Sequence, residues 1–586
     1  MNAAVQTAWT ELIAATLADA GVATCVISPG SRSTPLVAAL SKQTRLELVS
    51  IIDERAAAFF ALGVARATGT PAALVCTSGT AAAHYLPALV EASMAGVPMI
   101  AITADRPPEL HDCGASQTID QIDLYGKFVR GAFDLGAPVG TTVAARAVRR
   151  KLIQAITLAR GPHPGPVHLE VPLSKPLEPA PPSTEDERAF ARTTAELIGQ
   201  PIVAPPRLAP DPQGLDALAL AIAAEPAGLI VVGAMPPGFA AVRDRVFALA
   251  RRAGYPVLAE AGSQLRYGAR PSDVTLVDQF DLIPASAVPQ PRLVIQLGAE
   301  PVAGSWSALL GSANPARWVL ADHRWHDPDS NARGVIVGDI AAALDRVIAR
   351  LVDRAAQPAW LDDWHAAGAH ASTALDQALA IHPRSETAVI RAALDAVPEA
   401  ATLQIGNSLP IRIVDHVAGG GRARTVITQR GAAGIDGLIA SAAGATRRGA
   451  PVLLVLGDVS FAHDIGGLLA ARCASAPLAI VVIDNRGGQI FASLPIARAG
   501  LGAAYDQLFV TAPELDPAAV ASVLGARALT ATTATAVGTA VADALATPGV
   551  TVIHAPVTTS GARDVRRTAI ELYRSPELRT AHGGTT

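Results

Sequence analysis

Residues 451–488 have the sequence PVLLVLGDVSFAHDIGGLLAARCASAPLAIVVIDNRGG. It holds two apolar runs, 451–457 and 478–484, separated by a segment long enough for one helix. Continuous apolar runs of this length are typical of parallel strands that are buried on both faces. They are too short to cross a bilayer. The stretch therefore predicts two neighbouring strands of a parallel sheet, joined by a helix.

Polar residues follow both apolar runs. Gly457 and Asp458 follow the first, and DNRGG (484–488) follows the second. Ligands of open parallel sheets bind beyond the carboxyl ends of the strands, so Asp458 and Asn485 are expected to lie close together there. A carboxylate, an amide oxygen and a loop carbonyl such as that of Gly487 are hard oxygen ligands that suit Mg²⁺. The alternative is two ordinary turns, which these dipeptides favour in any case.

Similar strand–loop–helix units run through the rest of the chain. Further strands are expected at residues 22–28, 46–52, 72–77, 97–103, 166–172, 229–234, 255–260, 292–298, 401–406, 423–428 and 551–557. This alternation predicts an α/β protein with three open parallel-sheet domains and helices on both faces of each sheet. We place the domains at residues 1–185, 205–355 and 380–586. A Pro-rich, charged stretch at 176–211 predicts a linker, and the passage 359–381 predicts a helix.

Composition narrows the class of protein. The chain has 586 residues, of which 50% are hydrophobic, so extended disorder is excluded as a global description. A net charge of −4 does not fit a nucleic-acid binder with a broad basic surface. The four cysteines form no CxxC pair, which disfavours a zinc site or a disulfide framework and favours a reduced, cytoplasmic setting. Neither a signal peptide nor a membrane span is expected.

Glu54 opens an apolar helix predicted from about Asp53 to Ala67. The helix is apolar nearly all round, which implies deep burial. The helix dipole favours a charged Glu54, whereas burial beside Ala57 and Ala58 favours the neutral acid. We expect desolvation to prevail in part, so that Glu54 can share a proton with a ring nitrogen. The alternative is an exposed first-turn glutamate that stabilises the helix.

The order strand, GD, helix, strand, DNxGG resembles the signature of thiamine diphosphate (ThDP)-dependent enzymes. Val459 stands where that signature often has Gly, next to the proposed ligand Asp458. The resemblance implies ThDP and Mg²⁺, or Mn²⁺, as cofactors. It assigns the metal ligands as Asp458, Asn485 and Gly487, with Gln489 and Ile490 as further cofactor contacts.

The same resemblance implies a role for Glu54. In ThDP-dependent enzymes a glutamate so placed binds N1′ of the aminopyrimidine and promotes loss of the C2 proton of the thiazolium, which then acts as an electron sink for decarboxylation. Glu54 would lie in a pyrimidine-binding domain at 1–185, and the GD and DN motifs in a diphosphate-binding domain at 380–586, on either side of a central α/β domain. The complete site of this family normally spans two subunits, which implies a homodimer or homotetramer.

Seven segments narrow the resemblance further. They are ISPGSRSTPL (27–36), TSGTAAAHYLPALVEA (77–92), TADRPPEL (103–110), GASQTIDQ (114–121), GNSLPIR (406–412), QRGAAGIDG (429–437) and NRGGQIFASLP (485–495). Together they resemble the MenD family, the 2-succinyl-5-enolpyruvyl-6-hydroxy-3-cyclohexene-1-carboxylate synthases, which are transferases of menaquinone biosynthesis. The resemblance implies decarboxylation of 2-oxoglutarate, followed by 1,4-addition of the succinyl carbanion to isochorismate with release of CO₂.

Both substrates of that family carry two carboxylates, which arginines bind with two parallel hydrogen bonds. The family match assigns isochorismate to Ser31, Arg32 and Arg106, and the distal carboxylate of the succinyl group to Ser408, Arg412 and Arg430. It places Gln117, as a catalytic residue, beside the cofactor and the reacting intermediate. It places Ile435 beneath the bent cofactor, and Phe491 and Leu494 in an apolar wall. The alternatives are surface arginines and, for the apolar wall, core packing.

Several points stay open at this stage. Some MenD sequences have a Lys where Gly304 stands, so one substrate contact is either absent or supplied elsewhere. His84, His111 and His463 are expected to be partly buried structural imidazoles. Two other functions compete: a ThDP-dependent carboligase of the acetolactate synthase type, for which Arg412 and Arg430 would have little use, and a binding protein that kept the fold but lost the chemistry.

Overall fold

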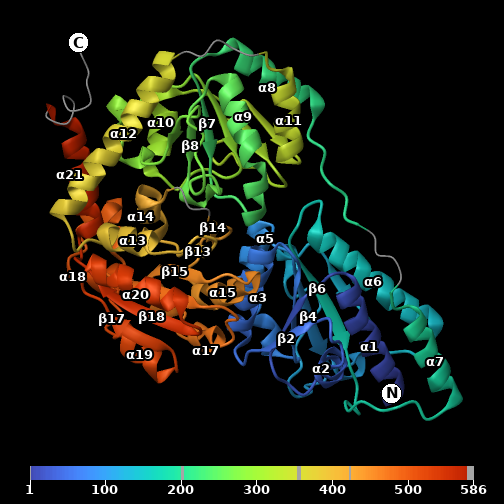
Figure 1. Ribbon diagram of the computed structural model, residues 1–586. Coiled ribbons are helices and arrows are strands. Elements are labelled where there is room, and N and C mark those ends of the chain that lie inside the picture. The colour runs from blue at the N-terminus through green and yellow to red at the C-terminus, as the bar shows by residue number, and fades with distance from the viewer. Residues whose placement is uncertain (1, 200–203, 353–357, 421–423, 577–586) are drawn as a thin grey trace. The chain divides into compact units, whose positions relative to one another are not determined.

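The computed structural model describes residues 2–199, 204–352, 358–420 and 424–576. In these ranges the strands form three six-stranded sheets in which every strand pairing is parallel (Figure 1). Helices cover both faces of each sheet, so the predicted α/β fold with three parallel sheets is confirmed. Some predicted features lie partly outside the described residues. They are residues 200–203 of the predicted linker, residue 423 of the strand predicted at 423–428, and the ends of some predicted domains.

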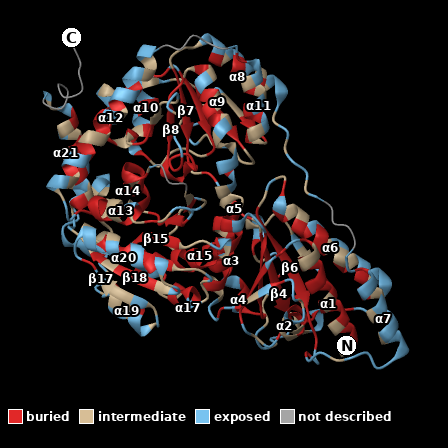
Figure 2. Cartoon of the chain, viewed as in Figure 1, coloured by how far each residue is buried: buried red, intermediate tan, exposed pale blue. Residues whose placement is uncertain are grey.

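The first sheet has the strand order β2-β1-β3-β4-β6-β5. Its strands are β1 (Thr24–Ile27), β2 (Glu47–Ser50), β3 (Ala72–Cys76), β4 (Met99–Asp105), β5 (Ala132–Asp134) and β6 (Pro166–Pro172). Helices α1 (Ala3–Asp19) and α6 (Thr142–Arg160) share a hydrophobic core with one face. Helices α3 (Glu54–Thr68) and α5 (Leu86–Ala95) pack against the opposite face of the same sheet. The central strands β3, β4 and β6 are buried throughout, as continuous apolar runs predict. Figure 2 shows this for β4 and β6, which are labelled there.

The second sheet has the order β12-β11-β10-β7-β8-β9. Its strands are β7 (Gly228–Val232), β8 (Val257–Ala259), β9 (Leu276–Val277), β10 (Leu293–Leu297), β11 (Ala316–Ala321) and β12 (Gly334–Val337). Alternate side chains of β7 point to opposite faces: Ile230 and Val232 share a core with α8 (Pro212–Ala224), α9 (Arg243–Ala253) and α11 (Ile340–Arg350), whereas Leu229 and Val231 share one with α10 (Gly304–Ala313) and α12 (Pro358–Ile381).

The third sheet carries the GD and DN motifs and has the order β14-β13-β15-β16-β18-β17, the same relative order as the first sheet. Its strands are β13 (Thr402–Ile405), β14 (Thr425–Thr428), β15 (Val452–Gly457), β16 (Leu478–Asp484), β17 (Arg527–Thr530) and β18 (Val550–Pro556). Helices α13 (Glu386–Asp395), α14 (Leu409–Val417) and α20 (Ala534–Ala546) lie over one face. Helices α16 (Asp458–His463) and α19 (Pro517–Val523) lie against the other.

The predicted strands are all present, within a few residues of their expected ends. Five further strands, β5, β9, β11, β12 and β17, were not expected from the sequence. Four of these have only two to four residues, too short for a clear periodic signal. Strand β11 is a different case, because its run Trp318-Val-Leu-Ala is apolar enough to have indicated a buried strand. The helix expected at 359–381 is α12.

The prediction that residues 176–211 form only a linker is wrong. Residues Glu185–Glu196 form helix α7, which packs against α1 and α6 through the buried Phe190. The helix begins with a capping box: the Thr184 hydroxyl accepts from the Glu187 N–H (3.3 Å), and the Glu187 carboxylate accepts from the Thr184 N–H (3.0 Å). The sequence contains the capping-box pattern Thr-x-x-Glu, but the surrounding prolines and charges favour a linker.

Replacing Thr184 with Ala is expected to destabilise α7 by about 0.5–2 kcal/mol, because one backbone N–H of the first turn loses its acceptor. Hydrogen exchange of the α7 amides should report this as reduced protection. The control is Thr193→Ala in the same helix, away from its cap, which should leave protection of the first turn intact. Equal loss of protection in the two variants would contradict a capping role for Thr184.

By internal contacts the chain divides into two compact units. Unit 1 comprises Met1–Pro206, Gln429–Gly449 and Asp464–Ser475, and unit 2 comprises Arg207–Thr428, Ala450–His463 and Ala476–Thr586. Unit 1 therefore contains the first sheet together with α15 (Leu438–Ala445) and α17 (Gly467–Ala471), and unit 2 contains the other two sheets. The domain boundaries at 1–185, 205–355 and 380–586 stay a prediction. None of the helices in the described ranges combines the length and hydropathy needed to span a membrane.

Candidate active site

The ends of β15 and β16 bring the GD and DN motifs together in unit 2. The two strands pair in parallel, with Gly457 opposite Ile483, so Asp458 and Asn485 emerge side by side. The Gly487 N–H donates to Asp458 Oδ2 over 2.6 Å. Gly487 has a φ of +108°, and a Cβ there would lie 2.3 Å from the Val510 carbonyl oxygen, so only glycine fits.

Asp458 is a buried carboxylate with a perturbed pKa. Its side chain accepts from the N–H groups of Val459 (2.9 Å) and Gly487. Burial raises the pKa of Asp458 to about 7, and the neighbouring Asp484 carboxylate contributes to the rise, while the two N–H groups oppose it. The pKa of Asp484 is lowered, chiefly by its hydrogen bond from His554 (2.9 Å). A cation beside Asp458 would relieve this concentration of negative charge.

Asn485 is buried and its amide is held by a residue from another element. Its Nδ2 donates to Oε1 of Glu386, the first residue of α13, over 3.1 Å. Burial raises the pKa of Glu386, and the N–H groups at the starts of α13 and α21 (Gly561–Arg574) and the Asn485 amide oppose the rise. Glu386 was absent from the predicted site because it lies about a hundred residues from the DN motif, in no motif that the sequence offered.

The donor set fits a hard divalent cation. It offers a carboxylate from Asp458, an amide from Asn485 and a backbone carbonyl from Gly487, the oxygen types that Mg²⁺ takes in proteins. The predicted residues that follow, Gln489 and Ile490, lie partly exposed in the turn after Gly487. Of the two residues predicted to form an apolar wall, Phe491 packs edge-on against Phe509, with ring centroids 5.5 Å apart. Leu494 is 45% exposed, so it is not part of the hydrophobic core.

Glu54 is the first residue of α3 in unit 1. Asp53 caps this helix by accepting from the N–H groups of Arg55 (2.9 Å) and Ala56 (3.3 Å). The expected deep burial holds for residues 56–67, while Glu54 itself is partly exposed at the helix start. Burial raises the pKa of the Cys76 thiol at the end of β3, and the charge of Glu54 adds to that rise. The Glu54 carboxyl therefore lies near the carboxyl end of the first sheet.

Gln117 is held against the TSGT segment of unit 1. The side-chain Nε2 of Gln117 donates to the Ser78 backbone carbonyl (3.1 Å), and the backbone carbonyl of Gln117 accepts from the Ser78 hydroxyl (3.0 Å). Gln117 has a φ of +56°, an unfavourable conformation for a residue other than glycine that is often found at functional sites. The buried Gln121 supports the same segment, because its Oε1 accepts from the Gly79 N–H (2.8 Å).

Two predicted isochorismate arginines lie close together in unit 1. Arg32 is buried, donates to the Leu173 carbonyl over 2.7 Å, and has an Nε without a hydrogen-bond partner among the described residues. Burial lowers the pKa of Arg32, and the neighbouring Arg106 lowers it further, while Asp105 opposes this. Arg106 donates to the Ser116 carbonyl, and Ser31 is exposed beside Arg32. Two adjacent guanidinium groups favour an anionic ligand.

Ser408 and Arg412 lie at the start of α14 in unit 2. Ser408 precedes the helix with a φ of +71°, again a strained conformation for a residue with a side chain. Arg412 donates from Nη1 to the Ser408 carbonyl over 2.7 Å. The two residues of the GNSLPIR motif that were assigned to the succinyl carboxylate are therefore in direct contact.

The third predicted succinyl contact, Arg430, and the cofactor contact Ile435 lie on one loop of unit 1. Gln429 closes the base of this loop by donating to the Asp436 carbonyl (2.8 Å). Glu91 anchors its first half: it accepts from the Gly431 and Ala432 N–H groups over 2.9 and 2.6 Å. Arg66 pairs with the same buried carboxylate at 2.7 Å. Glu91 belongs to a motif noted in the sequence, but nothing there indicated this contact.

The three histidines without an assigned role, His84, His111 and His463, differ in their exposure. His111 is partly buried and contacts Asp105 at 3.0 Å, as expected of a structural imidazole. His84 and His463 are exposed, which corrects the expectation that they are partly buried. Both stand at the ends of short helices, α4 (Thr80–Ala83) and α16, where the side chain reaches solvent.

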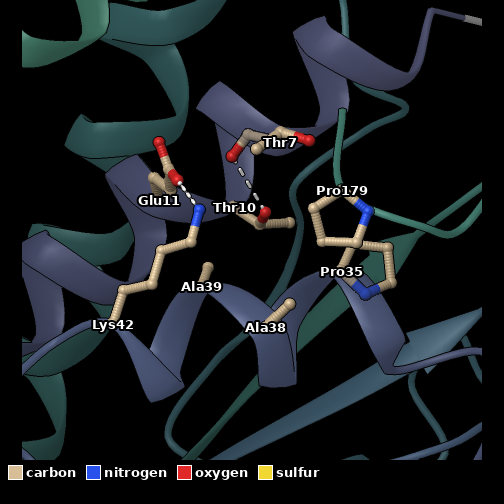
Figure 3. A pocket seen from close by; sticks show the side chains of 8 residues that line it. All are labelled: Thr7, Thr10, Glu11, Pro35, Ala38, Ala39, Lys42 and Pro179. Carbon is tan, nitrogen blue, oxygen red and sulfur yellow. Dashed lines mark hydrogen bonds and ion pairs between the residues drawn. The ribbon is translucent and has the colours of Figure 1, made fainter. Parts of the chain in front are cut away.

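A small hollow outside these clusters lies between α1 and α2 (Thr34–Ser41), where Lys42 pairs with Glu11 (Figure 3). It leaves no interior space for a water molecule, so it is not a ligand site.

Comparison with known proteins identifies the class. The family models described as thiamine pyrophosphate enzyme, N-terminal and C-terminal TPP binding domains, match residues 8–124 and 413–555. The fold resembles that of benzoylformate decarboxylase from Polynucleobacter necessarius, with a TM-score of 0.70 and 18% identity over 94% of this chain and 98% of that one. The chain is a ThDP-dependent enzyme, and thiamine diphosphate, with a divalent metal such as Mg²⁺, is its cofactor.

Closer relatives identify the family. The 2-succinyl-5-enolpyruvyl-6-hydroxy-3-cyclohexene-1-carboxylate synthase of Sorangium cellulosum is 40% identical over 98% of this chain and 97% of its own length. The synthase of the same name from Geobacillus thermodenitrificans is 39% identical over 92% and 91%. The chain belongs to this family of synthases, which confirms the resemblance seen in the seven motifs.

Proposed function

We propose that this chain decarboxylates 2-oxoglutarate and adds the resulting succinyl carbanion to isochorismate, using ThDP and Mg²⁺, as a transferase of menaquinone biosynthesis. The observation that carries the proposal is the cluster of buried oxygen donors at the ends of β15 and β16. Asp458, Asn485 and the Gly487 carbonyl would hold the metal and, through it, the diphosphate. Bound ThDP would supply the electron sink for decarboxylation.

The polar residues have separate tasks in this proposal. Glu54 holds a proton at N1′ of the cofactor pyrimidine, and Ile435 supports the bent cofactor. Arg32 and Arg106, whose charges are already adjacent, bind the carboxylates of isochorismate together with Ser31. Arg412, Ser408 and Arg430 hold the distal carboxylate of the succinyl group. Gln117, held by Ser78, lies beside the reacting carbon, and Phe491 and Leu494 exclude water from it.

Replacing Arg412 with Ala is expected to raise the KM for 2-oxoglutarate by about 10- to 150-fold. A charged hydrogen bond contributes roughly 1.5–3 kcal/mol, and about 1.4 kcal/mol is a factor of ten. Steady-state kinetics with each substrate varied in turn measures the effect. Arg391→Ala, which removes an arginine paired with Asp376 elsewhere in unit 2, is the control and should leave KM unchanged. A change confined to isochorismate kinetics would mean that the two carboxylate sites are assigned in reverse.

Substrate preference tests the proposal against the acetolactate synthase alternative. Release of CO₂ is measured with 2-oxoglutarate and with pyruvate, each with saturating ThDP and Mg²⁺. The arginines for a distal carboxylate predict a strong preference for 2-oxoglutarate. A preference for pyruvate would contradict the proposal.

The assembly and location remain predictions. We propose a homodimer or homotetramer in the cytoplasm, with small-molecule substrates and no nucleic-acid partner. The family resemblance, in which the complete site spans two subunits, supports the oligomer. The four unpaired cysteines fit a reducing compartment. Sedimentation of the purified protein measures the oligomeric state.

A further inference from the structure

We propose that Glu386 is a positioning residue for the metal: it fixes the Asn485 side-chain amide so that Oδ1, and not Nδ2, faces the cation. The inference rests on the proposed metal role of Asn485. It adds a residue from a separate helix, one that lies outside all of the sequence motifs. The contact that carries it is the hydrogen bond from Asn485 Nδ2 to Glu386 Oε1 at 3.1 Å.

The chemistry of the two side chains selects one amide orientation. A carboxylate only accepts hydrogen bonds, whereas an amide accepts at its oxygen and donates at its nitrogen. Glu386 can therefore bond only to the NH₂ group of Asn485. The amide oxygen, on the other branch of the same planar group, is then directed away from Glu386. Turning the amide over would place two oxygens against each other and present an NH₂ group to the cation.

Packing alone would not fix the orientation of the Asn485 amide. The two amide orientations have almost the same shape, so apolar neighbours do not distinguish them. Asn485 is only 6% exposed, so bulk water is not at hand to pair with a turned NH₂ group. The hydrogen bond to Glu386 therefore determines which end of the Asn485 amide faces the cation: the oxygen, which can bind it, or the NH₂ group, which would repel it.

Glu386 is itself held in place, which a positioning residue requires. It is 1% exposed and begins α13 directly after Ser385, whose hydroxyl caps the helix by accepting from the Ala388 N–H (3.2 Å). Gly561, at the start of α21, approaches its other oxygen: a Cβ there would lie 2.4 Å from Oε2. The Ala562 N–H adds a favourable interaction with the carboxylate. The carboxylate is therefore confined between two helix starts and the end of β16.

The test measures metal binding directly. Binding of Mn²⁺ in the presence of saturating ThDP is followed by the electron paramagnetic resonance signal of free Mn²⁺. Glu386→Met keeps the side-chain length but removes the acceptor, and should weaken Mn²⁺ binding by about 10- to 100-fold, the usual cost of losing a partner of a metal ligand. Glu386→Gln keeps an acceptor oxygen and should lose clearly less. Arg391→Ala, the matched control, removes an arginine of the same helix that pairs with Asp376 at 2.9 Å, and should leave the affinity unchanged.

Asn485→Ala separates this inference from the proposed function. If it does not weaken Mn²⁺ binding, the metal assignment itself is wrong. If it does, the double variant Asn485→Ala/Glu386→Met should bind no more weakly than Asn485→Ala alone, because Glu386 acts through Asn485. Three results would overturn the inference: normal affinity in Glu386→Met, losses that add in the double variant, or an equal loss in Glu386→Gln, which would indicate charge rather than orientation. If Glu386→Met does not fold, Glu386→Leu, which also lacks an acceptor, takes its place in all three comparisons.

Discussion

Replacing Glu54 with Gln is expected to slow exchange of the C2 proton of bound ThDP by roughly 10²–10⁴-fold, the usual contribution of a positioned acid or base. Gln has nearly the shape of Glu, but it cannot give or take a proton at N1′. The substitution lies at the first residue of a buried helix that Asp53 caps independently, so the fold and most of the cofactor binding should survive. Turnover should fall together with the exchange rate.

Quenched hydrogen–deuterium exchange read by NMR of the released cofactor measures the C2 rate. The control is Glu47→Gln, which removes a carboxylate of the same unit that pairs with Arg447 at the surface. That variant should exchange at the normal rate. Unchanged exchange in Glu54→Gln, with the cofactor bound, would exclude Glu54 as the activating acid.

Replacing Asp458 with Ala should weaken Mg²⁺-dependent ThDP binding by more than about 100-fold. Loss of a direct ligand should cost more than loss of a residue that only supports a ligand, which typically costs 10- to 100-fold. The variant also leaves the N–H groups of Val459 and Gly487 without their acceptor, at about 1–3 kcal/mol of folding stability for each buried group. Asp458→Asn keeps the shape of the side chain and separates the two effects.

Titration of ThDP at fixed Mg²⁺, followed by protein fluorescence, measures the affinity. Asp464→Asn is a close control, because Asp464 is also buried, also has a pKa raised to about 7 by burial, and also accepts from two backbone N–H groups, those of Ile439 and Ala440. It should lose stability but keep cofactor affinity within a few fold. Equal ThDP affinity in wild type and Asp458→Ala would contradict the metal assignment.

Much of the fold was predictable, because its strands are buried on both faces and so appear as continuous apolar runs. Strands β3, β4, β15 and β16 are examples. Edge strands such as β5 and β17 are short and partly exposed, and they carry no such signal. Helix α7 was missed for another reason: its capping box is a local signal, but nearby prolines suggested a linker, and its stability depends on Phe190 packing against distant helices.

The site was predictable only in part. Asp458 and Asn485 could be paired from sequence because strand order follows from the crossover between them. The contacts that support them come from residues far away in the chain: Glu386 holds Asn485, and Glu91 holds the loop of Arg430. Such contacts depend on how helices pack, which local patterns do not determine. The family motifs predict the metal ligands, whereas the hydrogen bonds to Glu386 and Glu91 appear only in the structure.

The proposed reaction is tested by product formation from isochorismate and 2-oxoglutarate by the purified protein, with and without ThDP and Mg²⁺. Mass spectrometry should find 2-succinyl-5-enolpyruvyl-6-hydroxy-3-cyclohexene-1-carboxylate, formed in equal amount to the CO₂ released and only when both cofactors are present. A folded, cofactor-bound protein that forms no such product would contradict the account and favour a binding protein that kept the fold without the chemistry.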